Sequence, residues 1–197
     1  MSITAADVQK LREITGAGMM DCKKALTESG GDFNKAIDYL RTKGLQQVDK
    51  KAGRTTEQGI IQAYIHPGSR LGVLVEINCE TDFVARTDAF LNFAKDVAMQ
   101  IAAAKPITVK REDVSQATIE HELDIYRAQA REQGKPENVI ERMITGKLEK
   151  FYQENCLLEQ AFVKDSDKTI RDYLTETISK LGENIIIKRF VRYQLGE

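Results

Sequence analysis

Two β-rich runs joined by a short turn constrain the fold of this chain more than any other feature. Residues 59–66 and 71–78 are rich in β-branched and apolar side chains, and a Pro-Gly-Ser-Arg tetrad separates them. Such a tetrad forms turns, so the pattern predicts a β-hairpin. Alternation predicts one shared face per strand, made of Ile61, Ala63 and Ile65 in the first and Val73, Val75 and Ile77 in the second.

Three short helices are predicted before the hairpin, within residues 4–44. Thr4 and Asp7 form a capping-box pattern at the start of the first helix. Apolar stripes at helical spacing then follow, made of Val8, Leu11 and Ile14, of Cys22, Ala25 and Leu26, and of Phe33, Ala36, Ile37 and Leu40. Gly44 stands where a helix-ending glycine belongs. The polar stretch after it has no period, which predicts a linker.

Helices also dominate the predicted structure after the hairpin. Periodic apolar patterns predict helices at residues 88–104, 115–133, 137–156 and 169–181. A break at Pro136 separates the second from the third, which indicates an αα-hairpin. A last β-rich run at 185–195 would complete a small antiparallel sheet of about three strands. The expected fold class is therefore α+β.

These patterns divide the chain into three parts. We expect a three-helix N-terminal module at residues 1–45, a linker at 46–58 and an α+β core domain at 59–197. The core domain would contain the hairpin at 59–78, helices between 88 and 182, and the C-terminal strand at 185–195.

The junction after the second predicted strand carries Thr81, Asp82, Phe83 and Val84, here called the tip segment (residues 81–84). Thr and Asp oxygens are suited to cap a helix, because they accept hydrogen bonds from unpaired backbone N–H groups. Capping does not require a large aromatic residue directly after the acid. Two interpretations stay open: Phe83 enters another protein, or it packs back onto its own helix as a hydrophobic staple.

Composition favours a protein as the partner of this chain. The 29 basic and 30 acidic residues give a formal net charge of -1, whereas nucleic-acid binders usually show a strong basic excess. No apolar run has the length of a membrane span. We expect no secretory signal, no direct binding of nucleic acid and no membrane association.

The cysteines and histidines predict neither a metal site nor catalysis. Cys22, Cys79 and Cys156 are far apart and form no CxxC pair, which indicates reduced thiols and a cytoplasmic location. His66 and His121 belong to no recognisable catalytic arrangement. A nucleophilic Cys79 would need a basic neighbour to lower its pKa, and none is evident. The chain also lacks a phosphate-binding loop. We expect no enzymatic activity, cofactor or metal.

Three stretches resemble the signatures of one known family. They are residues 15–26 (TGAGMMDCKKAL), residues 76–85 (EINCETDFVA), and a later helical segment from PEN at 136–138 to CLLEQ at 156–160. Together they resemble the bacterial translation elongation factor Ts family, in the family's order and over essentially the whole chain. Because the stretches are long and occur together, the resemblance is specific.

The resemblance implies a guanine nucleotide exchange factor for elongation factor Tu. Such a factor binds the GDP form, promotes GDP release and leaves when GTP enters. Carried over, the tip segment would insert near the magnesium and switch region of the partner, with Phe83 as a wedge and Asp82 holding it in register. Met19 and Met20 would contact the partner from the N-terminal module, which resembles ubiquitin-associated domains.

The chain departs from longer family members, which carry two related core subdomains, because its pattern contains one. Shorter members pair as homodimers, so we expect a homodimer formed through the C-terminal strand or the sheet region. Two other interpretations stay open. In the first, the N-terminal helices bind a ubiquitin-like or nascent-chain-associated partner and the rest is scaffold. In the second, Lys50, Lys51 and Arg54 bind RNA.

Overall fold

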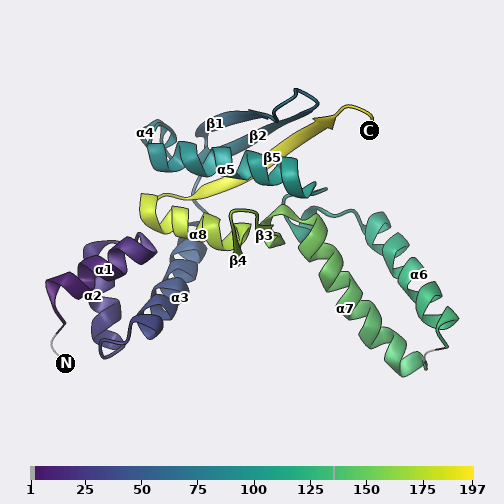
Figure 1. Cartoon of the computed structure of the whole chain (residues 1–197), viewed down its shortest axis with the longest axis horizontal. Coiled ribbons are helices and arrows are strands. Elements are labelled where there is room, and N and C mark those ends of the chain that lie inside the picture. Colours follow the sequence, from purple (N-terminus) through teal and green to yellow (C-terminus); the bar gives the residue numbers. More distant parts are fainter. Residues whose placement is uncertain (1–2, 135) are drawn as a thin grey trace. The chain divides into compact units, whose positions relative to one another are not determined.

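The computed structural model describes residues 3–134 and 136–197 (Figure 1). Its elements confirm the α+β class. The helices are α1 (Ala5–Thr15), α2 (Met19–Glu28), α3 (Phe33–Lys51), α4 (Asp82–Ala85), α5 (Asp88–Ala104), α6 (Gln116–Glu132), α7 (Glu137–Asn155) and α8 (Ile170–Leu181), with 3-10 turns η1 (Arg111–Asp113) and η2 (Leu157–Glu159). The strands are β1 (Gln58–Ile65), β2 (Leu71–Cys79), β3 (Ala161–Phe162), β4 (Asp165–Thr169) and β5 (Ile185–Gln194).

The chain forms two compact units, and each is built from segments that are distant in sequence. The first comprises Met1–Gln62, Glu76–Asp96 and Asp172–Ile187. The second comprises Ala63–Val75, Val97–Arg171 and Lys188–Glu197. Helices α1–α3 and the tip segment belong to the first unit, and α6 and α7 belong to the second.

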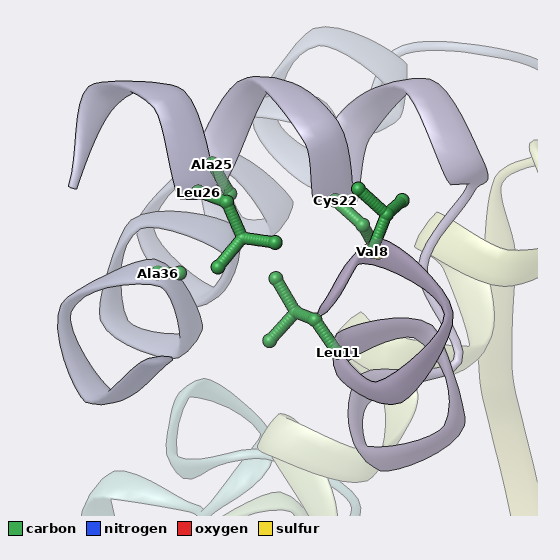
Figure 2. Close-up of a cluster of buried hydrophobic side chains, with 6 residues drawn as sticks. All are labelled: Val8, Leu11, Cys22, Ala25, Leu26 and Ala36. Carbon is green, nitrogen blue, oxygen red and sulfur yellow. The ribbon is translucent and has the colours of Figure 1, made fainter. Parts of the chain in front are cut away.

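A capping box starts α1, as the sequence predicts. The Thr4 backbone N–H donates to Asp7 Oδ2 over 3.0 Å, and the Asp7 N–H donates to Thr4 Oγ1 over 3.2 Å. Asp32 caps α3 in a similar way, because its Oδ1 accepts from the Lys35 N–H over 3.1 Å. The three helices enclose a small apolar core made of Val8, Leu11, Cys22, Ala25, Leu26 and Ala36 (Figure 2).

Helix α3 does not end at Gly44, so that prediction was wrong. The helix continues to Lys51, and residues 46–51 of the predicted linker are therefore helical. Gly44 instead allows close approach to α8: a Cβ built on it would lie 3.1 Å from Ser179 Oγ and 3.3 Å from Thr175 Cγ2. The glycine has a packing role that the local sequence does not reveal. The division into module, linker and core domain stays a prediction.

The three-stranded sheet has the order β1-β2-β5, and the hairpin of β1 and β2 is confirmed. Near the start of β1, Gly59 has a φ of 145°. The backbone of β2 lies so close to it that a side chain would not fit, since a Cβ there would lie 2.2 Å from the Ile77 carbonyl oxygen. The predicted faces are also confirmed, but they differ in burial. Val73, Val75 and Ile77 of β2 are buried, whereas Ile61, Ala63 and Ile65 of β1 are exposed.

Helices α6 and α7 form the predicted αα-hairpin in the second unit (Figure 1). Two apolar clusters hold the hairpin together, one formed by Ala130, Ile140 and Ile144 with Leu123 and Tyr126, and one by Val114, Phe151 and Cys156 with Ile119, Leu148 and Tyr152. The predicted apolar stripes therefore face one another inside the hairpin. In contrast, the short antiparallel pair β3–β4 was not predicted, because β4 has the polar sequence DSDKT.

Candidate functional site

The tip segment (residues 81–84) follows directly on strand β2. Thr81 caps the one-turn helix α4, with a φ of -126° and a ψ of 154°, and its Oγ1 accepts from the Val84 N–H over 3.4 Å. The predicted capping role is therefore confirmed, although it serves a separate short helix ahead of α5. Thr87 then connects the two helices: its Oγ1 donates to the Val84 carbonyl and accepts from the Phe90 N–H.

Phe83 projects from this short helix into solvent. Its exposed fraction is 79%, the largest among the apolar side chains exposed in the described chain. Ala85, two residues later, is buried and anchors α4. The interpretation of Phe83 as a hydrophobic staple is therefore wrong. Large aromatic side chains on a rigid element are typical of residues that enter a partner.

Asp82 forms an ion pair within the same segment. Arg86 Nη2 donates to Asp82 Oδ2 over 2.8 Å, four residues along the chain. Both side chains are substantially exposed, so the pair contributes little to stability. The Asp82 carboxylate also lies in the first turn of α4, where negative charge is favourable. The Asp82–Arg86 ion pair therefore lies on the surface of the protein.

Two carboxylates that the sequence did not indicate lie beside the tip segment. The Thr81 N–H donates to Glu183 Oε2 over 3.0 Å, and Thr81 Oγ1 donates to Glu183 Oε1 over 2.6 Å. The Asn184 N–H donates to Glu80 Oε1 over 2.6 Å. The loop between α8 and β5 therefore contacts the residues that immediately precede Asp82. No local pattern links these residues, because the two segments are about a hundred positions apart.

The two methionines that the sequence singles out lie in the first turn of α2. Met19 and Met20 are both exposed, at 44% and 75%. The buried residue of this turn is Cys22, which packs into the core of Figure 2. Both methionines therefore lie on the surface of α2, where flexible thioether side chains suit an adaptable contact. Their role in binding stays a prediction.

Cys79 is a buried structural thiol. Burial, followed by the nearby Glu183 carboxylate, raises the pKa of Cys79 to about 11. Its Sγ lies 3.1 Å from the Thr81 carbonyl oxygen, which it contacts as a donor. A neutral, enclosed thiol is a poor nucleophile at physiological pH. Cys79 therefore contributes to the packing under the tip segment.

The part of the chain that the structure describes contains no evident metal site. In residues 3–134 and 136–197, no three His, Cys, Asp or Glu side chains are grouped in a way that would hold a metal ion. His66 lies on the exposed hairpin turn, with Nδ1 3.0 Å from the Tyr64 hydroxyl. Over the same ranges, no helix is both long and apolar enough to cross a membrane.

Fold and site together define an α+β protein with three N-terminal helices and a solvent-exposed aromatic side chain on the short helix α4. The family model described as elongation factor TS matches residues 5–197. Similar proteins include the elongation factors Ts of Geobacter metallireducens, 63% identical over 100% of this chain and 91% of the relative, and of Thermoanaerobacter sp. strain X514, 61% identical over 99% and 96%. That of Carboxydothermus hydrogenoformans is 63% identical over 99% and 90%. The chain belongs to the elongation factor Ts family.

Proposed function

We propose that this protein is a guanine nucleotide exchange factor for elongation factor Tu, acting by binding and not by a chemical step. The observation that carries the proposal is the outward position of Phe83, within the segment that resembles a family signature. The protein would bind the GDP form of its partner, promote GDP release and dissociate when GTP enters. Its place of action would be the cytoplasm.

The tip segment acts on the magnesium and switch region of the partner. A G protein holds GDP through backbone N–H groups of its phosphate loop and through a bridging Mg²⁺. A Phe side chain suits a wedge there, because it fills a large apolar volume with few rotatable bonds. Its insertion shifts the groups that hold the cation, which leaves the phosphate charge poorly compensated. Asp82 keeps the wedge in register.

Exchange by this route requires that the factor and the nucleotide weaken each other's binding. The coupling is reciprocal, so the free energy by which the factor weakens GDP binding equals that by which GDP weakens factor binding. A thousandfold acceleration corresponds to a barrier lowered by about 4 kcal/mol. Burial of one Phe side chain, together with several hydrogen bonds, supplies a free energy of about this size. Met19 and Met20 would form a second contact from the N-terminal module.

The protein would function as a homodimer. The proposed dimer interface is the exposed face of the sheet. In the second unit, this face carries Ile65, Leu74, Val191, Tyr193 and Leu195, all exposed. The Leu195 N–H donates to the Arg70 carbonyl over 2.8 Å, so the end of β5 lies beside the hairpin turn. An exposed apolar face of this kind suits an interface between two copies of the chain.

Light scattering tests the dimer directly. We expect the mass of two chains at micromolar concentration, and the mass of one chain after Tyr193→Asp together with Leu74→Asp. These side chains are exposed, so the double variant should keep the circular dichroism spectrum of the unmodified protein. A mass of one chain for the unmodified protein across this range would refute the homodimer.

Stopped-flow fluorescence tests the exchange function. Release of a fluorescent GDP analogue from elongation factor Tu would be followed at fixed Mg²⁺, with the unmodified protein and with the Phe83→Ala, Asp82→Ala and Met20→Ala variants. We expect strong acceleration that Phe83→Ala largely abolishes and Asp82→Ala reduces. If the Phe83→Ala and Asp82→Ala variants still accelerate GDP release, Met19 and Met20 become the stronger candidates for the contact with elongation factor Tu. No acceleration by the folded protein would refute the function and favour an interaction module built on α1–α3.

A further inference from the structure

The pairing of strands β2 and β5 continues beyond their ends through side chains. Thr81 donates two hydrogen bonds to the Glu183 carboxylate, one from its backbone N–H and one from its hydroxyl. In the opposite direction, the Asn184 N–H donates to Glu80 over 2.6 Å. Each segment thus supplies one carboxylate to a backbone N–H of the other. This reciprocal clasp consists of Glu80, Thr81, Glu183 and Asn184.

The clasp leaves Thr81 with a partner for every polar group. Its carbonyl oxygen accepts from the Ala85 N–H over 3.3 Å and is contacted by the Cys79 thiol over 3.1 Å. Its N–H and hydroxyl both donate to Glu183. Because charge-assisted hydrogen bonds are shorter and stronger than neutral ones, Glu183 provides the largest restraint on this residue.

Glu183 also determines what the Thr81 hydroxyl is able to do. A hydroxyl has a single hydrogen, and here that hydrogen is directed at Glu183 Oε1. The oxygen lone pairs are then free to accept from the Val84 N–H, which is the cap of α4. Since Phe83 is the second residue of this four-residue helix, the orientation of its ring depends on that cap.

The backbone on either side holds Glu183 in place. Gly182 ends α8 with a φ of 79°, and its N–H donates to the Ile178 carbonyl over 2.9 Å. Asn184 is buried, and its Nδ2 donates to the Arg54 carbonyl over 3.1 Å. The carboxylate is therefore presented by a short loop restrained at both ends.

We propose that Glu183 is a positioning residue for exchange: it holds Thr81, and through the cap of α4 it orients Phe83 before the partner is met. This inference rests on the proposed function, and it names the group that preorganises the tip segment. A preorganised wedge loses less conformational freedom on insertion than a mobile one does. Removal of the restraint should therefore slow exchange without removing any group that contacts the partner.

Glu183→Gln is the informative substitution, because it keeps the shape of the side chain and replaces one acceptor oxygen by a donor. We expect the apparent kcat/KM for GDP release to fall about tenfold, which corresponds to roughly 1.4 kcal/mol. In the free protein, we expect hydrogen exchange at the Thr81 amide to become about tenfold faster, as its N–H loses a charged acceptor. Glu132→Gln, the same carboxylate-to-amide change at an exposed position of α6 in the second unit, is the matched control and should leave both quantities unchanged.

The double variant Phe83→Ala with Glu183→Gln separates positioning from general destabilisation. If Glu183 acts through Phe83, its substitution has little further effect on exchange once the ring is absent. An equal loss of exchange in both backgrounds, or unchanged protection of the Thr81 amide, would overturn the inference. If the proposed function itself were wrong, the result would differ, because the unmodified protein would then fail to accelerate GDP release.

Discussion

Replacement of Phe83 by Ala should weaken binding to elongation factor Tu and leave the stability of the fold almost unchanged. Phe83 is 79% exposed, so about 40 of its roughly 200 Å² of side-chain area is buried. At about 25 cal/mol per Å², this burial stabilises the fold by about 1 kcal/mol, and the higher helix propensity of Ala offsets about half of that. The free energy of unfolding should therefore change by less than about 1 kcal/mol.

Burial of the remaining ring surface in a partner contributes much more to the free energy of binding than the ring contributes to the stability of the fold. About 160 Å² removed from water corresponds to about 4 kcal/mol as an upper estimate. Truncation of a buried aromatic anchor at an interface usually costs at least about 2 kcal/mol. We therefore expect Phe83→Ala to weaken binding to nucleotide-free elongation factor Tu by at least about thirtyfold.

Phe90 provides the matched control for this experiment. It lies seven residues further along the chain, in α5, and it is completely buried. Phe90→Ala should lower the free energy of unfolding by about 3–5 kcal/mol, because it creates a cavity. The unfolding free energies of Phe83→Ala and Phe90→Ala would both be measured by urea unfolding followed by circular dichroism.

Two results would refute the reasoning about Phe83. If its truncation destabilised the fold as much as Phe90→Ala does, the ring would be packed and not presented. If Phe83→Ala left both stability and binding to elongation factor Tu unchanged, the tip segment would not be the contact surface.

Three further predictions concern the fold around the site and the chemistry of buried groups. Gly59→Ala should cost at least about 2 kcal/mol of unfolding free energy, because φ is positive and a Cβ meets the facing strand, whereas Gly53→Ala, in open space, should change it by under about 1 kcal/mol; equal effects would contradict the strained geometry. The Arg111 guanidinium holds the pKa of Glu159 below its usual value, so its ionised form stabilises the fold above the unfolded pKa of about 4.3, and this term is lost as pH falls through the lower folded pKa. Glu159→Gln should therefore destabilise the protein by about 1–3 kcal/mol at pH 7, with a deficit that shrinks toward pH 3 in urea titrations; a deficit independent of pH would contradict the ion pair. Cys79, with its raised pKa of about 11, should react with a thiol reagent at pH 8 only as fast as the protein opens, and a rapid reaction of the native protein would show an accessible thiolate.

Local patterns predicted most of the elements and left out those that depend on distant contacts. The pattern at residues 88–104 matches α5 (Asp88–Ala104), because an amphipathic helix is encoded by spacings of three and four residues. The end of α3 was missed, since Gly44 is placed by its approach to α8. The β3–β4 pair was missed because a short polar strand has no period of its own and forms only through its neighbour.

The candidate site divides in the same way. The sequence by itself determined the residue types of the tip segment, its position after a strand, and the capping role of Thr81, all of which depend on neighbours within a few positions. It left two positions open for Phe83, and only the tertiary structure decided that the ring faces solvent. The restraint from Glu183 also exists only in the folded chain. That carboxylate lies 102 positions from Thr81, and the packing of α8 and β5 brings it within hydrogen-bonding distance.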